Sequence, residues 1–422
     1  MMHPAEQICL IMKRIYDCEM TTLTGGNLSV MDDEGVMWVS PTNVDKGSLK
    51  PDDIVQVLPD GSIKGKYAPT SEYRAHHKIL TGSPGMRAVV HAHSPAMVTM
   101  SALHKLPNSK LSFAAWEAVE DIGLAEYGMP GTLKLVECVG EVFSKGYKAA
   151  LLKNHAAFLG SAVDLPDAFR RFEEMDYAAR LQINAAVWGP SRSLNGSDIA
   201  KIAALSAKAM PEYEREKTTP AELAARKKLA ELTRRANQKR LFTGSFGHIS
   251  TRVSGNDFLI VKAGVDSAYA AAGDFVLIRD GKRERGMVPE RLTVVHQKIY
   301  EKHPDINALV LAAPTYAMTF AVTDQPYDVT IIPESYGVLR SCLKFPIGAL
   351  ADSKELTDQL TLDSPFALIE NYGALFAGVN ATLAFDKLEV CEFSAQSIHF
   401  AKRLDEKIIS MTQDMIDEMD NQ

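Results

Sequence analysis

Two histidines lie one residue apart in the segment AVVHAHSPA, which covers residues 88–96. The neighbouring residues are largely apolar, which is typical of a buried strand, and alternate side chains of a strand point to the same face. His91 and His93 would then present two imidazoles on one face, where they could bind a single metal ion. The alternative is a partly buried strand whose two histidines only form hydrogen bonds. The pair alone does not distinguish the two interpretations.

The two halves of the chain resemble each other. Residues 71–90 are similar to residues 291–310, with histidine, lysine, isoleucine, proline and alanine at matching places. TGGNLSV from Thr24 is similar to SFGHISTR from Ser245, and LLKNHAAFLG from Leu151 is similar to LIENYGALFAG from Leu368. Three similar segments in the same order at a nearly constant offset indicate a duplicated domain. We predict one copy at about residues 1–205 and a second at about residues 220–422.

The copies differ at the residues that could do chemistry. The first copy has three histidines and one glutamate, which are His91, His93, His155 and Glu72. The matching positions of the second copy are apolar or aromatic, namely Leu311, Ala313, Tyr372 and Leu292. A purely structural role does not explain why all three histidines are lost together, so this loss favours a metal site in the first copy. His76 has a counterpart, His296, in the second copy, and we therefore assign it a packing or hydrogen-bonding role.

Several segments around these residues have recognisable secondary-structure patterns. A helical pattern begins the chain, a turn is expected at Gly25–Gly26, and Thr70 or Ser71 can cap a helix that includes Glu72. Short apolar runs indicate strands, and a long amphipathic pattern begins near Pro166. The helices are expected at 5–19, 71–82 and 165–186, and the strands at 35–40, 53–58, 88–93 and 148–154. Each copy is therefore predicted to be an α/β domain.

Composition limits the partners of the chain. The 422 residues are 46% hydrophobic and 23% charged, with a formal net charge of −7 and no run of Lys or Arg. These values are typical of a soluble globular protein and give no electrostatic support for a nucleic-acid or membrane partner. The five cysteines are widely spaced, which argues against a disulfide framework. Without the pattern of a signal peptide or a transmembrane run, the protein is predicted to be cytoplasmic.

A set of short motifs in the first copy resembles the class II aldolase/adducin family, in particular its zinc-dependent fuculose-phosphate and rhamnulose-phosphate aldolase branch. The motifs are TGGNLS, SPTN, PTSE followed by histidine, HAHS and KNH, in this order. The resemblance implies two tandem three-layer α/β/α domains, each with a central, mostly antiparallel sheet. It also implies a metal site near a subunit interface in a ring of four, and thus a homo-oligomer, either a dimer or a tetramer of two-domain chains.

The resemblance also implies roles for individual residues. His91, His93 and His155 would hold Zn²⁺, with another divalent ion possible, and Glu72 would be the acid–base residue. Tyr127 would act across a subunit interface. The substrate phosphate would be bound by Thr24, Asn27, Thr42, Asn43, Thr70 and Ser71.

The activity implied by this branch is cleavage of a ketose 1-phosphate to dihydroxyacetone phosphate and an aldehyde through an enediolate. A bound divalent ion stabilises the negative charge beside the carbonyl, and a carboxylate moves the proton. The family also contains decarboxylases, a dehydratase and pentulose-phosphate 4-epimerases, although the epimerases typically have aspartate where this chain has Glu72. A non-enzymatic scaffold like adducin is a further alternative.

The chain departs from the family pattern at three places. Asn43 and Ala156 stand where glycines are expected, and both residues bear on the fit of the phosphate. The second copy has no tyrosine in LKFPIGAL, the segment that matches the region of Tyr127. An alternating arrangement of first and second copies would therefore leave the first copy's site without a tyrosine from that position.

Overall fold

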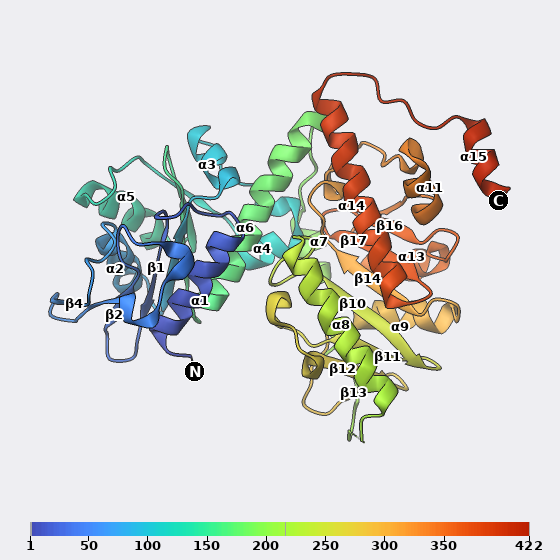
Figure 1. Cartoon of the computed structure of the whole chain (residues 1–422), viewed down its shortest axis with the longest axis horizontal. Coiled ribbons are helices and arrows are strands. Elements are labelled where there is room, and N and C mark those ends of the chain that lie inside the picture. Colours follow the sequence, from blue (N-terminus) through green and yellow to red (C-terminus); the bar gives the residue numbers. More distant parts are fainter. Residues whose placement is uncertain (1, 216, 422) are drawn as a thin grey trace. The chain divides into compact units, whose positions relative to one another are not determined.

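The computed structural model describes residues 2–215 and 217–421 (Figure 1). The chain separates into two compact units. Unit 1 consists of Met1–Ser109 and Ala115–Arg180, and unit 2 consists of Lys110–Ala114 and Leu181–Gln422. The short segment 110–114 thus belongs to unit 2, although it lies within the first copy in sequence. The predicted copy bounds at residues 205 and 220 stay a prediction.

Unit 1 is built on an eight-stranded sheet in the order β4-β3-β2-β1-β5-β8-β7-β6. Neighbouring strands are antiparallel except β6 and β7, which are parallel. The strands are β1 (Asn27–Met31), β2 (Met37–Val39), β3 (Val55–Val57), β4 (Ile63–Lys64), β5 (Ala88–Ala92), β6 (Gly123–Ala125), β7 (Ala149–Leu152) and β8 (Ala157–Ser161).

Helices cover both faces of this sheet. The helices of the first copy are α1 (Pro4–Asp17), α2 (Tyr73–Gly82), α3 (Pro95–Ala102), α4 (Phe113–Val119), α5 (Leu133–Ser144) and α6 (Leu165–Ala185). On one face α2 and α5 pack together over a core that includes Val89 and Phe158. Strand residues whose side chains point to the other face of the sheet, such as Val90, are also fully buried. Helix α1 packs against β1 and β2 and is joined to α6 by the buried Arg14–Glu173 ion pair, so the unit has three layers (Figure 1).

Unit 2 repeats this architecture. Its sheet order is β15-β16-β17-β14-β10-β11-β12-β13-β9, which is the order of unit 1 with one additional edge strand. The strands are β9 (Glu212–Tyr213), β10 (His248–Ser254), β11 (Asp257–Val261), β12 (Phe275–Arg279), β13 (Lys282–Glu284), β14 (Ala308–Ala312), β15 (Leu343–Phe345), β16 (Phe366–Ile369) and β17 (Gly373–Gly378).

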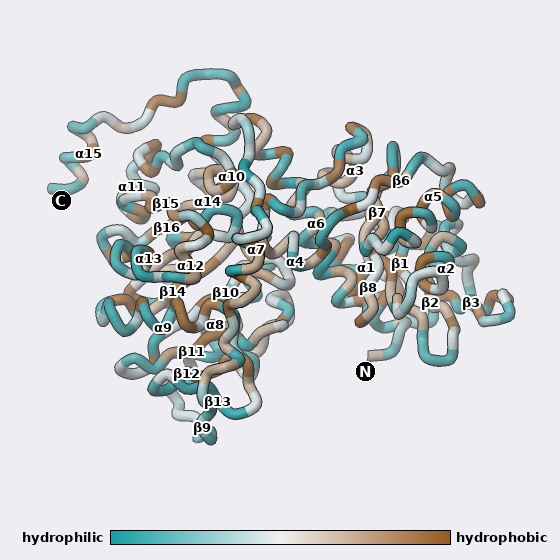
Figure 2. The backbone as a smooth tube through the Cα atoms, turned by 180° about the vertical axis from the view of Figure 1, so that it is seen from behind, coloured by the Kyte–Doolittle hydropathy of each residue, from teal (hydrophilic) through white to brown (hydrophobic). Residues whose placement is uncertain are grey.

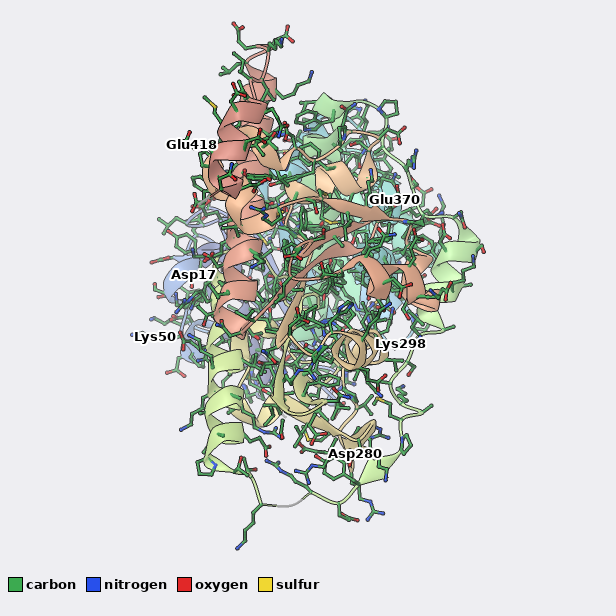
Figure 3. The ribbon with its side chains drawn as sticks, turned by 90° about the vertical axis from the view of Figure 1, so that its right-hand side faces the viewer. Asp17, Lys50, Asp280, Lys298, Glu370 and Glu418 are labelled. Atoms are coloured by element: carbon green, nitrogen blue, oxygen red, sulfur yellow. The ribbon has the colours of Figure 1, made fainter. Side chains whose placement is uncertain are left out.

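The helices of unit 2 also follow the order of unit 1, with additions at both ends. They are α7 (Gly196–Ala203), α8 (Pro220–Gln238), α9 (Thr293–Lys302), α10 (Ala317–Val322), α11 (Pro333–Leu339), α12 (Ala349–Asp352), α13 (Lys354–Gln359), α14 (Ala381–Arg403) and α15 (Gln413–Asp420). Apolar segments concentrate along the central strands of each unit (Figure 2). Charged residues such as Asp280 and Lys298 lie on the outside of unit 2 (Figure 3).

The strand register confirms the duplication residue by residue. In unit 1, Asn27 of β1 is paired with His91 of β5. In unit 2, His248 of β10 is paired with Leu311 of β14, as the sequence alignment requires. The predicted α/β class, the predicted tandem repeat and the mostly antiparallel sheet are therefore confirmed. None of the described helices has the length and apolar character needed to cross a membrane.

Candidate metal centre

The three predicted histidines come together at one end of two neighbouring strands of unit 1. His91 lies in β5 and His93 follows directly after its end, while His155 lies in the turn between β7 and β8. Strand β5 pairs with β8 so that Ala92 faces Ala157. This register places the turn that carries His155 beside the end of β5, although the residues are distant in sequence.

The imidazoles are close enough to share one ion. One ligand nitrogen from each of His91, His93 and His155 lies within 4.8 Å of the others. The Nε2 atoms of His91 and His93 are 3.0 Å apart. Ligand nitrogens on a tetrahedral zinc ion are separated by about 3.3 Å, since each bond is about 2.0–2.1 Å long. The three histidines could therefore hold a metal ion without large movements of the chain.

The protonation of the rings fits this role. His91 Nδ1 is 3.0 Å from the carbonyl oxygen of Ala157, which can only accept, so Nδ1 carries a proton and Nε2 is the atom that faces the other two rings. Burial lowers the pKa of His93 to about 3 and that of His155 to about 4. Both rings are therefore neutral near pH 7, which is the form that binds metal ions. Phe158 stacks on His91 with the ring centroids 4.0 Å apart and holds that ring in place.

Glu72 lies beside the histidines at the start of α2. Its Oε2 is 3.2 Å from His91 Nε2, and its Oε1 is 3.5 Å from His155 Nε2. Burial raises the pKa of Glu72, but His91, Asn27 and His155 together act more strongly and hold its pKa well below the usual range. Oε1 is buried and accepts no hydrogen bond from a described residue. A buried, ionised and incompletely bonded carboxylate fits a site that a cation or a substrate proton completes.

Two residues behind Glu72 fix its orientation. Asn27 donates from Nδ2 to Glu72 Oε2 over 2.8 Å, and its Oδ1 accepts from His76 Nε2. His76 Nδ1 lies 2.7 Å from the hydroxyl of Ser29. Burial lowers the pKa of His76 to about 3, so the ring is neutral and donates only from Nε2. His76 thus has a hydrogen-bonding role, and the Asn27 amide bonds to Glu72 and His76, while its predicted contact with the phosphate stays a prediction.

The glycine turn before β1 adjoins the histidines. A side chain on Gly25 would place its Cβ 3.5 Å from His93 Nδ1. Gly26 has a φ of +67° and a Cβ there would meet the His91 carbonyl oxygen at 3.0 Å. Thr24 is exposed next to this turn. Glycine is therefore needed at residues 25 and 26 because the backbone passes close to the histidines there.

The remaining predicted phosphate residues lie on segments that are hydrogen-bonded to each other. The backbone N–H of Thr42 donates to Ala68, and that of Thr70 donates to Ser40. Asn43 adopts the left-handed conformation with a φ of 51°, so it reproduces the backbone expected of glycine at this position. Ser71 lies 3.4 Å from the Cβ position of Gly131. The structure thus brings segments 41–43 and 70–72 together, and the assignment of a phosphate to them stays a prediction.

Tyr127 is not part of this cluster. It follows β6 and is 47% exposed. Its hydroxyl forms no hydrogen bond to another residue in the described part of the chain. The predicted action of Tyr127 across a subunit interface stays a prediction.

The equivalent place in unit 2 is filled with apolar side chains. Leu292, Leu311 and Tyr372 belong to the hydrophobic core of that unit, together with Phe113 from segment 110–114. The rings of Phe113 and Tyr372 are 5.9 Å apart, and the Phe113 backbone N–H donates to Asn371 over 2.8 Å. The guanidinium of Arg291 lies 4.9 Å from the centre of the Phe113 ring. Among the described residues of unit 2, no three side chains that could hold a metal ion come together at this place.

Two further residues of unit 1 were missed by the sequence analysis. Ser101 contacts the turn of His155, and Lys46 contacts the segment that includes Thr42. Both are replaced in the second copy, where Ala321 and Ser267 occupy the matching positions. The same comparison of the two copies that singled out the histidines could have found them.

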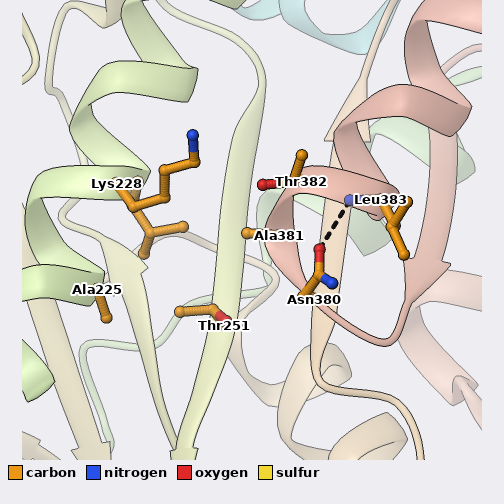
Figure 4. Close-up of a pocket in the computed structure, with 8 residues that line it drawn as sticks. Ala225, Lys228, Thr251, Asn380, Ala381, Thr382 and Leu383 are labelled. Carbon is orange, nitrogen blue, oxygen red and sulfur yellow. Dashed lines mark hydrogen bonds between the residues drawn. The ribbon is translucent and has the colours of Figure 1, made fainter.

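A surface depression of unit 2 is unrelated to this centre (Figure 4). It has a volume of about 500 Å³ and lies between α8 and the start of α14. The residues that line it are Ala225, Lys228, Leu229, Thr251, Asn380, Ala381, Thr382 and Leu383. None of them matches a predicted site residue of the first copy.

Several known proteins are similar to this chain. An L-fuculose phosphate aldolase from Methanocaldococcus jannaschii is 32% identical over 185 residues, which are 42% of this chain and 94% of that protein. A 5-methylthioribulose-1-phosphate/5-deoxyribulose-1-phosphate aldolase from Rhodospirillum rubrum is 33% identical over 142 residues, 32% of this chain and 63% of that protein. A 3-oxo-tetronate 4-phosphate decarboxylase from Escherichia coli is 26% identical over 201 residues, 47% of this chain and 93% of that protein.

The family described as Class II Aldolase and Adducin N-terminal domain matches residues 6–183 and again residues 227–399. These two matches coincide with the repeated sheet order and with the repeated strand register. The chain therefore belongs to the class II aldolase and adducin family, as a tandem duplication whose second copy has lost the three histidines.

Proposed function

We propose that the first copy is a zinc-dependent aldehyde-lyase that cleaves a ketose 1-phosphate to dihydroxyacetone phosphate and an aldehyde. The observation that carries the proposal is the convergence of His91, His93 and His155 around a buried carboxylate, Glu72, whose two oxygens lie 3.2 and 3.5 Å from two of these rings. The relatives include aldolases named for fuculose phosphate and for 5-deoxyribulose phosphate, which supports the same class of substrate.

A zinc ion on the three imidazoles would stabilise negative charge that develops next to the substrate carbonyl. Three imidazole ligands favour zinc over magnesium or calcium, which prefer oxygen ligands. Ala157 and Phe158 orient the His91 ring for this task. The turn between β7 and β8 positions His155.

Glu72 is proposed to give a proton to C3 of the dihydroxyacetone phosphate half when the C3–C4 bond breaks, and to take that proton back in the condensation direction. The hydrogen bond from Asn27 holds Oε2, which leaves Oε1 to accept the proton. Thr24, Thr42, Asn43, Thr70 and Ser71 are proposed to bind the phosphate through hydroxyls, an amide and backbone N–H groups. Tyr127 is proposed to exchange a proton with the C4 oxygen from a neighbouring subunit of a homo-oligomer.

The test follows the donor half-reaction, because it requires no knowledge of the aldehyde. Metal-loaded protein is incubated with dihydroxyacetone phosphate in D₂O, and the loss of the C3 proton signal is followed by NMR. Exchange is expected with the wild type and with Glu34→Gln, an exposed control, and is expected to fall at least about 100-fold with Glu72→Gln, within the range of a lost general base.

A fully metallated wild type without exchange would show that dihydroxyacetone phosphate is not the donor product. The same preparations are then offered a 3-oxo sugar-acid phosphate, because one relative is a decarboxylase of such a substrate. Release of CO₂ that depends on Glu72 would replace the aldolase assignment with a decarboxylase assignment. Protein that purifies without bound metal and binds none would support a scaffold.

A further inference from the structure

Lys46 is a buried lysine without a described counter-charge. Lys46 is only 1% exposed, and its ammonium donates a hydrogen bond to the carbonyl oxygen of Pro41. No carboxylate of the described residues forms an ion pair with it. Burial lowers the pKa of Lys46 to about 8, so the ammonium is still mostly charged at pH 7. A buried charge without a partner is costly, and such a cost is retained where the charge serves a ligand.

The position of Lys46 connects two of the predicted phosphate-binding segments. Its backbone N–H donates over 2.8 Å to the carbonyl of Leu23, the residue before Thr24. Its ammonium contacts the carbonyl of Pro41, the residue before Thr42. Pro41 in turn forms a bridge with Pro69, the residue before Thr70. Lys46 therefore bonds to the residues that precede Thr24 and Thr42, and the second of these is paired with the residue that precedes Thr70.

The second copy shows that the fold itself does not require this lysine. Ser267 occupies the matching position, and its backbone N–H keeps the equivalent bond, to Gly244, over 3.2 Å. The Ser267 hydroxyl donates to Thr243 over 2.6 Å instead of reaching the segment that matches Pro41. In the same copy Thr42 and Thr70 are replaced by Ala263 and Glu290. The lysine is thus absent where two of the hydroxyls proposed to bind phosphate, those of Thr42 and Thr70, are absent too.

All six residues predicted to bind the phosphate are uncharged, and the nearby Glu72 is negative. An anion bound only by neutral groups beside a carboxylate lacks electrostatic compensation. We propose that Lys46 is a positioning residue for the anionic end of the substrate, which fixes the Pro41–Asn43 turn and supplies the positive charge behind it. The proposal rests on the proposed function only in that the anion is a phosphate.

Two substitutions separate the charge from the hydrogen bond. Lys46→Gln keeps an N–H donor for Pro41 and removes the charge, whereas Lys46→Met removes both. Lys50→Met is the control, since Lys50 is exposed. Binding of inorganic phosphate to the metal-loaded proteins is measured by calorimetry, together with metal content, and exchange is measured with dihydroxyacetone phosphate and with unphosphorylated dihydroxyacetone.

We expect the phosphate dissociation constant to rise at least about tenfold in both Lys46 variants, since both lose the positive charge of the Lys46 ammonium near the bound phosphate. The KM for dihydroxyacetone phosphate should rise with little change in kcat, while metal content and exchange of dihydroxyacetone stay at wild-type levels. If Lys46→Met does not fold, Lys46→Gln decides.

Unchanged phosphate affinity in folded, metal-replete Lys46→Gln would refute the proposal. Equal losses with the phosphorylated and unphosphorylated donor would also refute it, because they would assign Lys46 to the fold alone. If the wild type binds phosphate but does not exchange the C3 proton of dihydroxyacetone phosphate, the proposed function is contradicted. The phosphate affinities of the Lys46 variants would then still decide the role of Lys46.

Discussion

The hydroxyl of Ser101 joins both sides of the turn that carries His155. It accepts a hydrogen bond from the His155 backbone N–H over 2.7 Å and donates one to the Leu152 carbonyl over 2.7 Å. Ser101 is fully buried near the end of α3, the helix that begins just after His93. One short helix therefore connects two of the three proposed metal ligands.

Ser101→Ala is expected to weaken metal binding about 10- to 100-fold, as is typical when a group that orients a metal ligand is removed. Zinc affinity is measured by competition with a chromophoric chelator. Thr99→Ala is the matched control, because Thr99 is exposed and its hydroxyl donates to Pro95 within the same helix. Wild-type zinc affinity in folded Ser101→Ala would mean that the turn keeps His155 in place without the serine.

Zinc is expected to raise the melting temperature of the wild type and not that of His93→Ala. A ligand that binds only the folded state at 100 times its dissociation constant adds about 2.7 kcal/mol to the free energy of unfolding. Differential scanning calorimetry with zinc and with a chelator measures the difference. His77→Ala should respond like the wild type, since His77 is exposed and is not one of the three clustered histidines. A full zinc response of His93→Ala would remove His93 from the ligand set.

Asn27→Ala distinguishes two roles of the asparagine amide. If Asn27 mainly holds Glu72, kcat for proton exchange falls about 10- to 100-fold, because the carboxylate is no longer fixed. If it mainly binds phosphate, the KM for dihydroxyacetone phosphate and the dissociation constant for inorganic phosphate rise instead. The hydrogen bonds to Glu72 and His76 predict the first result. A pure KM effect would overturn this prediction.

Unit 2 is expected to lose stability as the pH falls below about 6.5. His248 and His296 are buried with their Nε2 atoms 3.2 Å apart, and burial lowers the pKa of His248 to about 4. The unfolded chain, with a histidine pKa near 6.5, therefore takes up protons that the folded unit excludes, so stability is retained above this value and lost toward pH 4. For His248 alone the loss is about 2 kcal/mol at pH 5.

Urea unfolding followed at pH 7 and at pH 5 tests this pH dependence. His248→Asn, which introduces the residue found at the matching position of unit 1, should reduce the difference between the two pH values. An unaltered difference in this variant would show that other groups dominate the acid sensitivity of the unit.

Local sequence patterns predicted a strand with His91 and His93 at alternate positions and a helix that includes His76. The similarity of the two halves predicted the duplication. The convergence of His155 with that pair depends on the pairing of β5 with β8, which no local pattern specifies, and it was indicated by the correlated loss in the second copy and by the family resemblance. The left-handed turn at Asn43 was foreseeable because asparagine tolerates that conformation. Ser101 and Lys46 are marked by no local pattern, since each acts through bonds to backbone atoms, and only their replacement in the second copy distinguishes them.

The position of Phe113 in unit 2 has a consequence for the history of the duplication. Its ring packs with Tyr372 where the first copy has a histidine, and its backbone is hydrogen-bonded to Asn371. Restoring the lost histidines by mutation would therefore not restore an open cavity, because the space is already occupied by residues that stabilise the unit. The absence of the three histidines from this copy is therefore hard to reverse, because each substitution back to histidine would also have to open space that Phe113 and Tyr372 now fill.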